Sequence, residues 1–142
     1  MRRTVLLASV IALGVGAAFA QSGPIDQRKA EMKAMGGAAG PMGKMLKGEE
    51  AFDLAKVKTS LETIAKNAKS GPALFPAGSD KGETKAQPAV WTDKAKFDGL
   101  FAKLAADATA AASAIKDEAT FKAEAGKVLG NCGACHKEYR AQ

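Results

Sequence analysis

The 142 residues are enough for one domain. The formal net charge is +6, but the lysines are spread along the whole chain and the few aromatic residues do not interleave with a basic run, which indicates a solvated surface and argues against nucleic-acid binding. The chain has two cysteines and one histidine, too few for a four-ligand zinc site built from these residues.

The first twenty residues have the features of a secretory signal peptide. Arg2 and Arg3 form a basic start, residues 5–19 form a short apolar run, and residues 18–20 read Ala-Phe-Ala, a small-residue cleavage site. The apolar run is too short for a comfortable membrane span, although an uncleaved anchor is the alternative. We therefore expect residues 1–20 to be cleaved and the protein to be exported to the periplasm. Residues 21–142 would then form one domain with a net charge near +4 and no later membrane span.

A first helix is predicted to begin at Pro24, since proline is tolerated in the first turn of a helix. It should extend to about Gly40, because Pro41 bends or ends a helix. Its inner face repeats at a spacing of three or four residues, through Ile25, Arg28, Met32 and Met35.

Three further helices follow from the same periodicity. We predict them over residues 53–69, over residues 88–115, and from a cap at Asp117 or Thr120 to about Arg140. Residues 71–87 are rich in glycine and proline and read as a long crossover connection, with Leu74 and Phe75 as its anchors in the core. No strand-length run alternates at period two. The fold class predicted is therefore all-α, an antiparallel up-down-up-down four-helix bundle.

The chemistry-bearing stretch lies near the end of the last helix. Cys132, Cys135 and His136 form C-x-x-C-H, the attachment signature of c-type haem. Positions three apart on a helix lie on one face, so the two thiols can each form a thioether with one haem vinyl group. His136 follows at once and can bind the iron as the proximal ligand. The sequence therefore predicts one covalently bound haem c.

The cysteine pair has two other interpretations. A redox dithiol of the thioredoxin type normally opens a helix after a strand, whereas this pair lies near the end of a helical chain. A structural disulfide across two residues would close a very small loop and contribute little stability. A haem-free thiol oxidoreductase stays open as an alternative.

The helical pattern and the C-terminal motif together resemble the class II c-type cytochromes, the family of cytochrome c′ and cytochrome c-556. The R-x-x-x-M-K stretch of residues 28–33, Val90-Trp91 at the start of the third helix and Tyr139-Arg140 match as well. The resemblance implies a four-helix bundle around one haem. It also implies two branches, one five-coordinate with a non-ligating residue beside the iron and one low-spin with a methionine ligand. The matching position here is Met32.

Bundle geometry independently favours Met32 as the distal ligand. In an up-down-up-down bundle the fourth helix ends where the first begins. His136 and Met32 should then lie roughly 6 and 12 Å from the same end of the bundle. Met35, one turn further on, is the rival ligand, and simple core packing of Met32 is the alternative.

Four more residues are candidates for the haem pocket. Arg28 lies on the same face as Met32 and suits a haem propionate. Arg140 could do the same or stabilise a helix C-terminus. Phe97 and Leu104 are candidates for packing against the haem, with ordinary core packing as the alternative.

We therefore expect an exported electron carrier, not an enzyme, that exchanges single electrons with redox partner proteins. The first alternative is a five-coordinate protein that binds nitric oxide or another small gas. The resemblance is compatible with a homodimer through the first two helices, whereas the charged helix surfaces suit a monomer.

Overall fold

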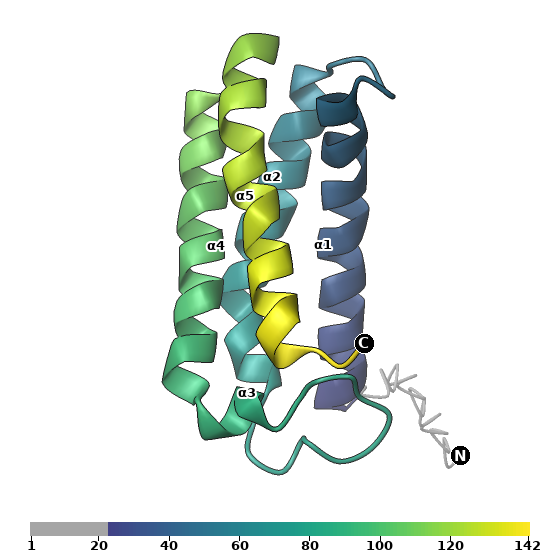
Figure 1. The fold of residues 1–142 in the computed structure, drawn as a ribbon, viewed down its shortest axis with the longest axis vertical. Helices are drawn as coiled ribbons and strands as arrows, with labels where there is room; N and C mark the ends of the chain where they lie inside the picture. Colours follow the sequence, from purple (N-terminus) through teal and green to yellow (C-terminus); the bar gives the residue numbers. More distant parts are fainter. Residues whose placement is uncertain (1–22) are drawn as a thin grey trace, which may run out of the picture.

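The computed structural model describes residues 23–142, so the predicted signal peptide lies outside the described residues. Four long helices run alternately up and down (Figure 1). The described chain has no strand, only one isolated bridge. The predicted all-α four-helix bundle is confirmed. The elements are α1 (Pro24–Lys47), α2 (Leu54–Ser70), the 3₁₀ helix η1 (Gly71–Leu74), α3 (Ala89–Thr92), α4 (Lys94–Ala114) and α5 (Glu118–Tyr139).

Helix α1 is longer than the sequence predicts, because it continues through Pro41 to Lys47. A proline inside a helix costs about 3 kcal/mol or more, since a backbone hydrogen bond is lost and the ring crowds the preceding turn. Here Met42 and Met45, just beyond the proline, are both buried in the core. Their burial offsets that cost. The helix ends instead at Gly48, whose φ of 75° favours glycine.

The helix starts follow local capping chemistry. The Asp53 carboxylate accepts a hydrogen bond from the backbone N–H of Lys56 at the start of α2. At the start of α5 the two predicted caps act together, because Asp117 accepts from the Thr120 N–H and the Thr120 hydroxyl accepts from the Asp117 N–H. Two hydrogen bonds that the Asp117 carboxylate accepts, from the Thr120 backbone N–H first and then from the Thr120 hydroxyl, lower the pKa of Asp117.

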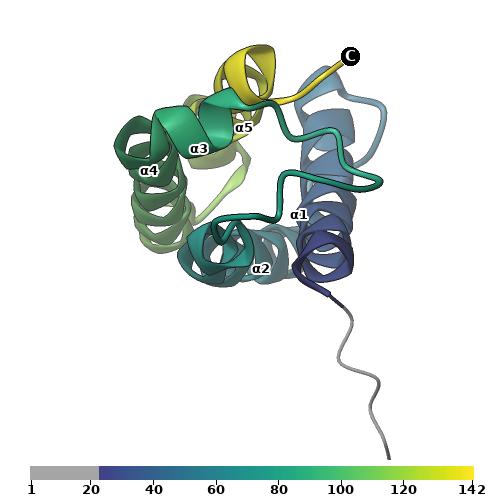
Figure 2. The same cartoon turned by 90° about the horizontal axis from the view of Figure 1, so that it is seen from below.

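The predicted third helix is divided in two at Asp93, which leaves helical geometry with φ −126° and ψ 49°. The short α3 packs separately from α4: Val90 is fully buried, and the Trp91 indole donates to the Pro76 carbonyl over 3.0 Å. These contacts hold α3 against the long loop, which Figure 2 shows crossing the same end of the bundle. Tertiary packing thus overrides the continuous helical periodicity of residues 88–115.

An aromatic cluster closes this end of the core. Phe97 of α4 lies at its centre, with ring centroids 4.8 Å from Phe75, 5.2 Å from Phe101 and 5.2 Å from Tyr139. Phe75 is buried, so it anchors the loop as predicted, while Leu74 is half-buried. Aromatic pairs at these separations stabilise beyond their buried area. The cluster therefore fixes the loop, α4 and the end of α5 relative to one another.

Gly71 provides a test of this packing. A Cβ at Gly71 would lie 2.2 Å from Cε1 of Phe101, so Gly71→Ala must displace the ring. We expect the free energy of unfolding to fall by about 1–3 kcal/mol, which would lower the melting temperature by several degrees. Gly99→Ala is the matched control, because its Cβ meets nothing within 4 Å and alanine favours the helix. A melting temperature unchanged by Gly71→Ala would contradict the close contact.

Candidate haem site

Two cavities meet between α1, α4 and α5. The larger has a volume of about 470 Å³ and the smaller about 160 Å³. Three residues line both of them: Met32 of α1, and Cys135 and His136 of α5. These three side chains therefore lie where the cavities adjoin, and the two helices that carry them face each other across the space.

The two cavities differ in chemistry. The smaller is almost entirely apolar, and its lining includes Met35, Ile64, Phe101, Leu104 and Cys132. At Gly36, also in this lining, an added Cβ would meet nothing within 4 Å, so the helix surface there is open. The larger cavity has an aromatic floor and a mouth of basic side chains. An apolar macrocycle that carries two carboxylates would fit these residues, because the smaller cavity offers apolar walls and the larger one offers cations for the carboxylates.

All eight residues proposed from the sequence line one or both cavities. Phe97 forms part of the floor of the larger cavity, Leu104 lies in the smaller one, and Arg140 is at the exposed rim. Met35, the rival of Met32, is buried and lines only the smaller cavity. The geometry thus brings the eight together, while their individual roles toward a haem remain predictions. The complete set is Arg28, Met32, Phe97, Leu104, Cys132, Cys135, His136 and Arg140.

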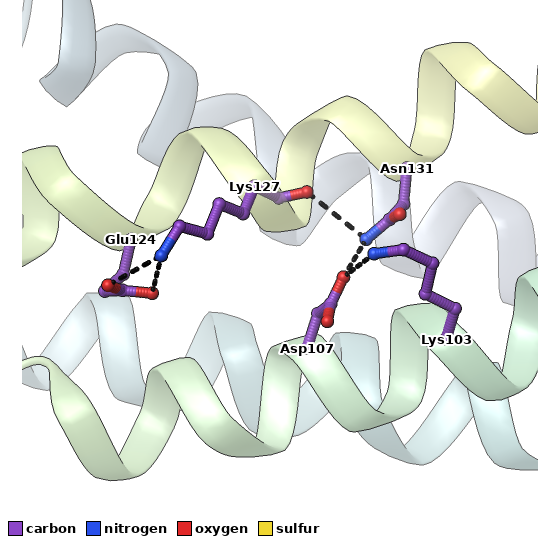
Figure 3. A network of polar contacts seen from close by, with 5 residues as sticks. All are labelled: Lys103, Asp107, Glu124, Lys127 and Asn131. Atoms are coloured by element: carbon purple, nitrogen blue, oxygen red, sulfur yellow. Dashed lines mark hydrogen bonds and ion pairs between the residues drawn. The ribbon is translucent and has the colours of Figure 1, made fainter.

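A polar network holds α5 against α4 beside the motif. Figure 3 shows its members, Lys103, Asp107, Glu124, Lys127 and Asn131. The Asn131 amide, one residue before Cys132, donates to the Asp107 carboxylate over 2.7 Å, and Lys103 pairs with the same carboxylate. Lys103 and then Asn131 lower the pKa of Asp107. The network therefore sets the position of α5 next to the first cysteine.

The ionisation of the motif suits a haem site better than thiol chemistry. Burial raises the pKa of Cys132, and burial with the nearby Cys132 and Glu138 raises the pKa of Cys135 to about 11. Reactive cysteines of oxidoreductases have lowered pKa values instead. Burial, followed by the positive Arg140, lowers the pKa of His136 and favours the neutral imidazole that can bind a metal.

Arg28 is buried, with a relative exposure of 4%. Its guanidinium donates to the Ser79 carbonyl over 2.8 Å, the Ser79 hydroxyl over 3.0 Å and the Thr84 hydroxyl over 2.7 Å. It also lies over the Phe75 ring at 4.9 Å, and burial lowers its pKa. Within the described part of the chain no carboxylate forms an ion pair with it. Arg28 therefore ties α1 to the long loop while its charge stays without a protein counter-ion beside the larger cavity.

Removal of Arg28 should loosen the loop. Arg28→Met leaves the Ser79 and Thr84 oxygens without these donors. We therefore expect the free energy of unfolding to fall by on the order of 2 kcal/mol or more. The measurements are the melting temperature and the rate of tryptic cleavage after Lys81 and Lys85, which should rise. Arg140→Met serves as control, since that side chain is exposed. An unchanged cleavage rate in the Arg28 variant would show that these contacts do not hold the loop.

Sequence reasoning missed the attachment of the loop to the end of α5. Ala86 pairs with Arg140 in an isolated antiparallel bridge, and the backbone N–H of Gln87 donates to the Tyr139 carbonyl over 2.9 Å. The bridge brings Thr84, Lys85 and Ala86 into the lining of the larger cavity. A single bridge between residues so far apart leaves no periodic signal in the sequence.

The fold and the site define a four-helix bundle with a C-x-x-C-H haem motif on its last helix. Residues 23–140 match the family model described as cytochrome C′, and the chain belongs to that family. It is 55% identical to cytochrome c′ of Rhodopseudomonas palustris over 99% of this chain and 97% of that protein. A solved structure of cytochrome c′ from the same organism has a TM-score of 0.83 and 58% identity, covering 86% of this chain and 98% of that one.

The cytochromes c-556 are relatives as well. Cytochrome c-556 of Agrobacterium fabrum is 40% identical over 90% of this chain and 87% of that protein. The family binds one c-type haem, so the cofactor of this chain is haem c, one per chain. The predicted family and cofactor are thereby confirmed.

Proposed function

We propose that this protein is an exported monohaem cytochrome that carries single electrons between redox partners, with His136 and Met32 as the axial ligands of the iron. One observation carries the proposal. Met32 and His136, from α1 and α5, are two of the three residues that line both cavities. A macrocycle that occupies both cavities would therefore lie against both of these side chains.

The residues around the cavities would have different roles toward the haem. Cys132 and Cys135 would hold the cofactor through thioethers, and His136 and Met32 would bind the iron. The haem supplies a one-electron couple, and a thioether ligand raises its reduction potential. Arg28, a buried cation without a carboxylate partner among the described residues, would neutralise a propionate. The apolar lining of the smaller cavity would favour the apolar part of the haem over water.

Export is part of the proposal. The signal-like features of residues 1–20 support it. The solved R. palustris structure supports it as well, because it matches 86% of this chain, and residues 21–142 make up the same fraction of the sequence. Within residues 23–142 no helix is long and apolar enough to cross a membrane.

A five-coordinate gas-binding protein is the second candidate. The 55% identical relative is named cytochrome c′, and the smaller cavity beside Met32 and His136 is apolar, which suits a small uncharged gas. In that case Met32 would pack beside the iron without binding it. The raised cysteine pKa values oppose the third candidate, a haem-free thiol oxidoreductase.

The optical and EPR spectra of the purified holoprotein separate these candidates. Ligation by His136 and Met32 gives a low-spin ferric spectrum and slow, weak uptake of carbon monoxide after reduction. A high-spin ferric spectrum with rapid gas binding would contradict the electron-carrier proposal and favour the gas-binding candidate.

A further inference from the structure

The charged residues that line the larger cavity all have the same sign. Five of them line it, and none is a carboxylate: Arg28, Lys29, Lys33, Lys85 and Arg140. Arg28 is buried, whereas the other four are exposed and come from α1, the long loop and the residue after α5. Figure 1 shows that these three segments meet at the end of the bundle where the chain terminates. We call the four exposed residues, Lys29, Lys33, Lys85 and Arg140, the basic collar.

The basic collar is largely uncompensated by the protein. In the described chain, Lys33, Lys85 and Arg140 have no carboxylate within ion-pair distance, and Lys29 reaches only Glu83 at 3.9 Å. Side chains as exposed as these two, at 51% and 99%, interact weakly. Elsewhere in the described chain, six of the fourteen other lysines have closer carboxylate partners: Lys56, Lys94, Lys96, Lys103, Lys122 and Lys127. Two haem propionates would offset only part of the charge of five cations.

We infer that the basic collar is the docking surface for an acidic redox protein. This inference rests on the proposed electron-carrier function and names its partner by charge. The four exposed cations belong to the lining of the larger cavity, so the solvent-facing edge of a haem in that cavity would lie near them. A negative surface that binds these cations would therefore bring the partner's redox centre close to the haem. One electron passes between the iron and that centre, so one is oxidised and the other reduced, and no bond forms or breaks. Opposite charges steer such an encounter and raise its rate at low salt.

The test measures electron transfer from the reduced holoprotein to oxidised plastocyanin, an acidic blue-copper protein, by stopped flow. The collar variant is Lys33→Glu with Lys85→Glu. The matched control is Lys66→Glu with Lys116→Glu, which makes the same change in net charge at two exposed lysines that line neither cavity. Spectra and reduction potentials of the wild type and both variants are measured first, so that the rates are compared after correction for any difference in driving force.

We expect the collar variant to react about 10-fold or more slowly than the wild type at low ionic strength, and the control within about 2-fold of it. The difference should vanish near 1 M salt, where screening acts over about 3 Å. Equal slowing in both variants would overturn the inference, because net charge alone would then explain the rate. Slowing with hexacyanoferrate(III) but not with plastocyanin would also overturn it, since the collar would then attract only small anions.

Failure of the proposed function would look different. A wild-type protein that is high-spin and takes up gas rapidly would contradict the electron-carrier assignment itself, whatever the collar variants do. A low-spin wild type whose rate with plastocyanin ignores both salt and the collar variant would leave that assignment standing and reject the docking surface.

Discussion

The intact mass of the exported protein is expected to equal that of residues 21–142 plus one haem, and the haem should remain attached after denaturation. Both expectations follow from Cys132 and Cys135, which lie one helical turn apart beside the two cavities. Replacing both by alanine should leave a mass of the bare polypeptide and a haem that acidified organic solvent extracts completely. Mass spectrometry and absorbance of the extracted protein measure the two effects.

The single cysteine variants provide the control for that experiment. Each retains one thioether, so each should keep a haem that resists extraction, while its spectrum shifts because one vinyl group stays unsaturated. The double variant should also melt at a lower temperature than either, since a ligand bound to the native state stabilises it. A bare polypeptide mass for the wild type, from cells that mature other c-type cytochromes, would contradict attachment at this motif.

Local chemistry explains why much of the bundle was predictable. Asp117 and Thr120 cap α5 through bonds that span three residues, and such contacts can be read directly from the sequence. The motif is equally local, because Cys132, Cys135 and His136 share one turn and a half of helix. The placement of Met32 needed only helix rise and an antiparallel topology.

The features that could not be predicted depend on contacts between distant residues. The continuation of α1 through Pro41 depends on the burial of Met42 and Met45 by other helices. The break at Asp93 accompanies the packing of α3 against the loop. These contacts appear only once the chain has folded, and periodicity within one segment does not reveal them.

The basic collar could not be predicted from the sequence either, because its residues are far apart in the chain. Lys29, Lys85 and Arg140 are separated by more than fifty residues of chain at each step, and nothing in the sequence places them together. The bridge between Ala86 and Arg140 joins two of the three segments, and Arg28 joins α1 to the same loop through Ser79 and Thr84. The long loop, read from sequence as a connection, therefore completes the mouth of the larger cavity.

If Met32 binds the iron as proposed, its replacement by alanine is expected to convert a low-spin iron into a high-spin one. Loss of the thioether ligand should open the distal face, speed the binding of carbon monoxide to the reduced protein and lower the reduction potential on the order of 100 mV, since axial ligands set much of the potential. Optical spectra, EPR and potentiometry of the purified holoprotein measure these changes.

Met35→Ala is the matched control, since the same residue type is truncated on the same helix. Met35 lies three residues after Met32, which places it about 4.5 Å further along the helix axis. Its side chain lines only the smaller cavity and is buried among core residues. The variant should therefore lose about 2–5 kcal/mol of stability and keep the wild-type spin state. If Met35→Ala converts the iron to high spin and Met32→Ala leaves the spin state unchanged, Met35 is the ligand. If both variants stay low-spin, the sixth ligand lies elsewhere, and Met32 at the junction of the two cavities is a packing residue.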